Sequence, residues 1–111
     1  MDYALVLMTL PASIPAEDLL RQLLEQRMIA GVNIIPDVAT RYSDGSTLHD
    51  TRETIYLCRT IPDNVAALRA FVRAHTGEHD FEITVLSASA GNPLYSDWIR
   101  RATESAPGGE S

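Results

Sequence analysis

The chain has 111 residues, of which 45% are apolar and 22% charged, and its formal net charge is −6. These values are typical of one soluble globular domain, and no apolar run reaches the roughly 20 residues of a membrane span. The acidic balance without any lysine argues against nucleic-acid binding. A single cysteine excludes an intramolecular disulfide. The N-terminus has no basic segment before its apolar one, so we expect a cytoplasmic protein without a signal peptide.

The first part of the chain predicts a strand and then a helix. Residues 3–10 form an apolar run that is typical of a strand buried on both faces. Residues 15–28 follow a helical pattern, with Ser13 as the N-cap and Arg27 in the last turn. The predicted buried face of this helix consists of Leu19, Leu20, Leu23, Leu24 and Met28.

A long hairpin is predicted next. Residues 29–45 and 47–60 read as its two extended strands, and Asp44-Gly45 is a strong turn signal between them. Pro36 cannot donate to the ladder, which predicts a bulge or a sheet edge at that position. The part of the hairpin near the turn is polar, so we expect it to reach beyond its own domain.

The remainder predicts a second helix, a strand and a short final helix. Residues 64–75 bury Val65, Leu68, Phe71 and Val72 on one helical face, and Thr76-Gly77 ends the helix. Residues 79–89 read as a strand, and Gly91-Asn92-Pro93 turns the chain into a helix over 94–103. Residues 1–104 form a single domain in this interpretation, followed by a disordered tail over 105–111.

The order β-α-β-β-α-β indicates a ferredoxin-like fold, an α/β fold of the α+β type. Two helices cover one face of its antiparallel sheet, and the short C-terminal helix is added at the end. The same strands place apolar residues on the other face, for which no further helix is left. Self-association is the simplest way to cover that face.

Several segments resemble one known family. EQRMIAGVNIIPDV, the strand end Arg59-Thr60 and FEITVLSASAGNPLYSDWI resemble the CutA family of divalent-cation tolerance proteins, over about residues 2–103. GNPLYSDWI is the most specific of these segments. The resemblance implies a homotrimer in which the hairpin reaches a neighbouring subunit. It also implies that Tyr95 and Trp98 lie on a helix at a subunit interface.

The resemblance further implies binding of copper or another divalent cation, through a site that is partly lost here. The family's metal ligands are a cysteine near the end of the first strand and a histidine pair after the second helix. Met8, His75 and Thr76 stand at these positions, and a methionine thioether suits Cu(I). His79 lies close by in the densest group of ligand-type residues, so His75, Met8 and His79 are the candidate metal ligands. Gly77 interrupts the helix that an H-x-x-E-H metalloprotease site would need.

Two alternatives remain open from the sequence. One is a PII-like trimeric sensor that binds a small polar ligand or a nucleotide in clefts between subunits, with Arg59, Glu82 and Tyr42 as candidate ligand residues. Arg59 and Glu82 could equally form a structural ion pair. The other is a scaffold trimer that holds a partner protein through its hairpin tip.

No catalytic motif is present, so we expect no enzyme activity and no catalytic residue. Cys58 lies in an apolar strand and reads as a buried, inert thiol. His49 lies in the polar part of the hairpin, where we expect it to pair with Asp50 or Glu53, or to contact a neighbouring subunit.

Overall fold

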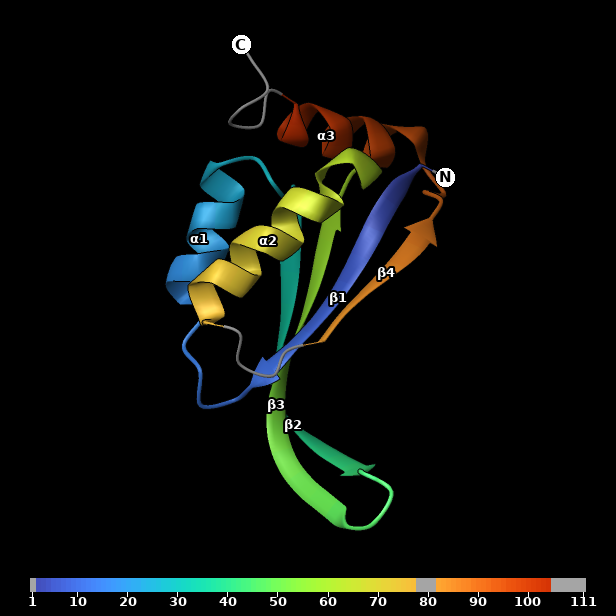
Figure 1. The fold of residues 1–111 in the computed structure, drawn as a ribbon. Coiled ribbons are helices and arrows are strands. Elements are labelled where there is room, and N and C mark those ends of the chain that lie inside the picture. The colour runs from blue at the N-terminus through green and yellow to red at the C-terminus, as the bar shows by residue number, and fades with distance from the viewer. Residues whose placement is uncertain (1, 78–81, 105–111) are drawn as a thin grey trace.

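The computed structural model describes residues 2–77 and 82–104. Its four strands form one antiparallel sheet in the order β2-β3-β1-β4. Two helices cover one face of the sheet and a third crosses one end (Figure 1). In chain order the elements are β1 (Tyr3–Pro11), α1 (Glu17–Glu25), β2 (Gly31–Ser43), β3 (Leu48–Thr60), a 3-10 turn (Pro62–Asn64), α2 (Val65–Thr76), β4 (Glu82–Ala88) and α3 (Pro93–Thr103). The ferredoxin-like α+β prediction is confirmed, while the predicted tail over 105–111 lies outside the described residues.

The helix α1 is shorter than predicted at both ends. It begins at Glu17 after Ala16, which makes no side-chain cap, so the prediction of Ser13 as the N-cap is wrong. Before the helix, a tight turn joins the amide of Ile14 to the carbonyl of Pro11. The helix ends at Glu25 because the backbone turns left-handed at Arg27, with φ of 59°.

Arg27 therefore lies beyond the last turn of α1, where it does not compensate the helix dipole as predicted. Its guanidinium donates instead to the carbonyl oxygens of Arg101 and Glu104 at the end of α3. Leu24 is 42% exposed, so it is not part of the buried face of α1. That face consists of Leu19, Leu20 and Leu23.

The other helices end as their sequences indicate. Helix α2 buries Leu68 and Val72, and its C-cap is Gly77, whose left-handed φ of 70° favours glycine. The side chain of Asn92 caps α3 by accepting a hydrogen bond from the amide of Leu94 at 2.9 Å. The prolines at the starts of the 3-10 turn and α3 lack an N–H, which costs little at a helix N-terminus.

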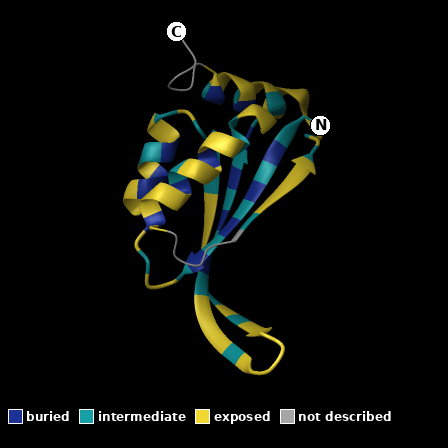
Figure 2. Ribbon diagram, in the orientation of Figure 1, coloured by how far each residue is buried: buried dark blue, intermediate teal, exposed yellow. Residues whose placement is uncertain are grey.

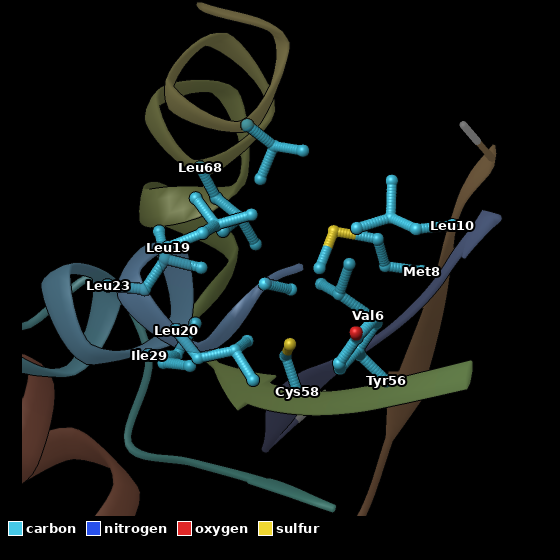
Figure 3. Close-up of a cluster of buried hydrophobic side chains, with 12 residues drawn as sticks. Val6, Met8, Leu10, Leu19, Leu20, Leu23, Ile29, Tyr56, Cys58 and Leu68 are labelled. Carbon is cyan, nitrogen blue, oxygen red and sulfur yellow. The ribbon is translucent and has the colours of Figure 1, made fainter. Parts of the chain in front are cut away.

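The hydrophobic core lies between the sheet and the helices α1 and α2. Alternate residues of β1 face it, and they pair across the ladder with alternate residues of β3, as Val6 does with Cys58 and Met8 with Tyr56. Figure 3 shows these side chains meeting the leucines of the two helices. The buried cluster comprises Val6, Met8, Leu10, Ala16, Leu19, Leu20, Leu23, Ile29, Tyr56, Cys58, Leu68 and Val72.

The opposite face of the sheet, which we call the open face, has no helical layer within residues 2–77 and 82–104 (Figure 1). Its central residues are half-buried and mostly apolar: Leu5 and Leu7 on β1, with Ile55 and Leu57 on β3. The prediction that β1 is buried on both faces is therefore wrong within one chain. Since the two helices lie on the core side, these residues are shielded, within the described part of the chain, by neighbouring strands and by the end of the sheet near α3.

The distal part of the hairpin, residues 38–52, forms an arm that projects from the domain (Figure 1). The ladder between β1 and β3 ends at the pair Pro11 and Glu53, and beyond it β2 and β3 pair only with each other. The register shifts between Ile35 and Val38, which confirms the bulge predicted at Pro36. Figure 2 shows that most of the arm is exposed.

Candidate functional site

The open face presents three rows of side chains that run across the sheet. One row holds Leu86, Leu5, Arg59 and Gly31; the next holds Thr84, Leu7, Leu57 and Asn33; the third holds Thr9, Ile55 and Ile35, level with the backbone of Glu82 on β4. On the outer strands, Leu86 is 45% exposed and Ile35 44% exposed. A group of partly exposed apolar side chains is typical of a protein–protein interface, and here it consists of Leu86, Leu5, Leu7, Leu57, Ile55 and Ile35.

Helix α3 borders the open face with aromatic side chains. The ring of Tyr95 lies 5.7 Å from the ring of Tyr3 in an edge-on arrangement, and 5.5 Å from the ring of Trp98. Trp98 in turn lies over Gly31 at the start of β2, since a Cβ on Gly31 would come within 3.3 Å of its ring. Tyr95 and Trp98, the predicted interface residues, thus stand together at one end of the open face.

Arg59 occupies the corner between Gly31 and Trp98. Its Nη1 donates to Oδ1 of Asn33 on the neighbouring strand. Its Nη2 lies beside Gly31, where a Cβ would approach to 2.9 Å. The Nε atom is buried without a hydrogen-bond partner among the described residues, which is uncommon for a guanidinium. The missing side chain of Gly31 therefore makes the space in which Arg59 packs.

The three predicted ligand-cleft residues do not meet within one chain. Arg59 is level with Leu5 of β1, whereas Glu82 is level with Thr9. This offset of four positions along β1 places the two backbones about 13 Å apart along the strands. Tyr42 pairs with His49 near the far end of the arm. The ion pair of Arg59 with Glu82 and a shared cleft between subunits both stay predictions.

The predicted metal ligands lie in different environments. Met8 is 1% exposed and belongs to the apolar core. His75 is exposed in the last turn of α2, and His79 lies outside the described residues. Among residues 2–77 and 82–104, no group of three or more His, Cys, Asp or Glu side chains is placed to hold a metal ion. The ligand set of His75, Met8 and His79 therefore stays a prediction.

At the tip of the arm, His49 has a different partner from those that the sequence predicts. His49 forms a hydrogen bond of 2.9 Å through Nε2 to Oδ2 of Asp44, not to Asp50 or Glu53. The bond from His49 and the backbone N–H groups of Ser46 and Thr47 hold the pKa of Asp44 well below its usual value. The turn brings the two side chains together, because it folds the chain back at Gly45. The Asp44-Gly45 turn signal is the feature of the sequence that could have indicated this pairing.

Cys58 is buried within the core, as predicted. Burial raises the pKa of its thiol to about 12, against an opposing effect of the charge of Arg59. At neutral pH the thiolate, which is the reactive form, is essentially absent. Cys58 is therefore a packing residue in this fold.

No helix within the described part of the chain combines the length and apolarity of a membrane span.

An antiparallel ferredoxin-like sheet with one open, apolar face defines the class of the protein. The family model of the CutA1 divalent ion tolerance protein matches residues 4–102. The chain therefore belongs to the CutA1 divalent ion tolerance family. Protein CutA of Mus musculus is 31% identical over 97 residues, which cover 87% of this chain and 55% of the mouse protein. This chain thus spans about half the length of that relative.

Solved structures agree with this assignment. The divalent cation tolerance protein (Cut A1) of Thermus thermophilus matches with a TM-score of 0.82 at 30% identity, covering 91% of this chain and 98% of that one. The periplasmic divalent cation tolerance protein CutA of Archaeoglobus fulgidus matches with a TM-score of 0.81 at 22% identity, covering 92% and 99%. The second match is a likeness of fold.

Proposed function

We propose that this chain assembles into a homotrimer through the open face of its sheet, and that the arm contacts a neighbouring subunit. The observation that carries this proposal is the apolar surface of Leu5, Leu7, Ile55 and Leu57, which the two helices leave without a covering layer. Full burial of a leucine or isoleucine side chain is worth about 1.5–3 kcal/mol. A closed ring of copies covers the open face of each copy and leaves no sheet edge free to bind further copies.

The substitution Leu57→Glu is expected to convert the trimer into monomers. It places a charge in the middle of the open face, where burial against a second copy would leave that charge unpaired. Sedimentation velocity or native mass spectrometry at micromolar concentration measures the outcome. Leu24→Glu is the matched control, since Leu24 lies on α1 on the other side of the sheet and is 42% exposed. A wild-type monomer under these conditions would contradict the proposal.

We further propose that the assembled protein takes up divalent cations, copper among them, and has no catalytic role. The family match supports this function. His75 supplies an exposed imidazole at the end of α2, which suits Cu(II) or Zn(II). Met8 and Thr76 stand where the family resemblance places other ligands, so the family site is reduced here. We place this activity in the cytoplasm.

Removal of the His75 imidazole is expected to lower the number of cations bound to the assembled protein by one per chain. The test is native mass spectrometry of the metal-free protein after titration with Cu(II), Cu(I) or Zn(II), with the His75→Ala variant beside the wild type. His75 is exposed, so the variant should keep the fold and the subunit number. Uptake that does not change in His75→Ala would contradict a site at the end of α2.

A second candidate is a sensor for a small polar ligand in a cleft between subunits. The guanidinium of Arg59 favours it, because Nε is buried without a hydrogen-bond partner in the described part of the chain. A ligand of this kind would raise the melting temperature of the wild type by mass action on the folded state. The same ligand should not change the melting temperature of an Arg59→Ala variant.

A further inference from the structure

The tip of the arm brings two different metal-ligand atoms together. Nε2 of His49 and Oδ2 of Asp44 are separated by 2.9 Å. Ligand atoms that share one Zn²⁺ or Cu²⁺ ion, each at about 2.0–2.2 Å from the metal, lie about 3 Å from each other. The pair therefore has nearly the separation of two neighbouring ligands. Both side chains are open to solvent, with 39% of His49 and 48% of Asp44 exposed.

Neighbouring groups hold both side chains in place. The imidazole of His49 is stacked on the ring of Tyr42, with ring centres 4.8 Å apart and planes 14° apart. Oδ1 of Asp44 accepts hydrogen bonds from the amides of Ser46 and Thr47 at 2.9 and 2.8 Å, and from the hydroxyl of Ser46 at 3.1 Å. These bonds leave Oδ2 directed at His49. Ligands oriented in this way lose little conformational freedom on binding a metal.

The charges at the tip are also compatible with a cation. Arg41 and Asp50 form an ion pair with each other at 3.0 Å. They occupy the register position next to Tyr42 and His49, so their side chains point to the other face of the two-stranded arm. The guanidinium is thus neutralised and directed away from the Asp44 carboxylate.

We propose that His49 and Asp44 form a two-ligand site for a divalent cation, with Cu(II) preferred. An imidazole nitrogen with a carboxylate oxygen suits Cu(II), Zn(II) and Ni(II), and Cu(II) binds such donors most tightly. The cation displaces the hydrogen bond and lies to one side of the line between the two atoms, at about 2.0–2.2 Å from each. Water fills the remaining coordination positions. This site shares no residue with the one proposed at His75, so each stands or falls by its own variant.

The test is Cu(II) titration of the full chain, followed by calorimetry and by ¹H–¹⁵N spectra. Bound Cu(II) is expected to broaden the amide signals of residues 42–49. His49→Phe keeps a ring for stacking on Tyr42 but has no ligand nitrogen, and it should weaken this binding step at least about tenfold. Asp44→Asn keeps an oxygen acceptor for the turn amides and should also weaken it. The unbound spectra report whether each variant keeps the fold.

His75→Ala is the matched control, because it removes an exposed histidine from the other proposed site. The tip signals should still broaden in that variant, at the same Cu(II) concentration as in the wild type. Equal Cu(II) affinity of wild type and His49→Phe at this step would overturn the proposal. Broadening that spares residues 42–49 would do the same, whatever happens at His75.

Discussion

The substitution Met8→Ala is expected to lower the free energy of unfolding by about 2–5 kcal/mol. Met8 is 1% exposed and lies in the core between the sheet and the two helices. Truncation removes its apolar contacts and leaves a cavity that the surrounding leucines fill only in part. The loss is measured by urea unfolding, which is monitored through the fluorescence of Trp98, the only tryptophan of the chain. The protein concentration is held constant, because subunit association contributes to stability.

Met8→Leu separates the packing role of Met8 from a role as a metal ligand. This substitution keeps the volume and apolar character of the side chain, and it should cost less than about 1.5 kcal/mol. We expect the variant to take up Cu(I) as the wild type does, since the thioether is enclosed by apolar neighbours. A stable Met8→Leu protein that has lost Cu(I) uptake would instead identify the sulfur as a ligand.

The substitution Gly31→Val is expected to lower the free energy of unfolding by about 1–3 kcal/mol through overpacking. A Cβ at this position would lie 2.9 Å from Nη2 of Arg59 and 3.3 Å from the ring of Trp98. Valine otherwise favours strands. A loss of stability would therefore show that the space beside Arg59 and Trp98 is too small for the added side chain. The emission of Trp98 should shift in the folded variant, because its ring must move.

A double-mutant cycle assigns this cost to Arg59. Arg59→Ala removes the nearer of the two contacts, and therefore Gly31→Val should be less costly in that background. The expected coupling exceeds about 0.5 kcal/mol, the range found for residues in contact. Strictly additive effects of the two substitutions would show that Arg59 moves aside without cost and that Trp98 alone limits the space.

Most of the fold could be predicted from the sequence. The apolar run of residues 3–10 and the apolar spacing of α1 and α2 are local patterns that predict a strand and two helices. The helical spacing also predicts which side of each helix faces the core. Its errors in helix bounds fall at the two ends of α1. The end of α1 depends on the left-handed backbone at Arg27 and on the carbonyls of α3 that this arginine contacts. No local pattern reports such a contact across the chain.

The candidate sites show the same division. His75, Arg59 and Trp98 were predicted as site residues because they lie in segments that resemble the family. The partner of His49 was assigned wrongly, because strand neighbours such as Asp50 point to the opposite face of the arm. The structure pairs His49 with Asp44 across the turn. A turn signal predicts that the chain reverses, while the side chains that then meet depend on its geometry.

The sequence by itself determined the order of the elements, since this follows from periodicity and turn signals, and its local motifs carry the resemblance to the CutA family. The tertiary structure alone decided that Met8 is enclosed in the core and that Arg59 packs in the space left by Gly31. It also decided that Leu5, Leu7, Ile55 and Leu57 form the centre of the open face. The physical reason is that burial depends on which elements pack together, and residues far apart in the chain determine that packing.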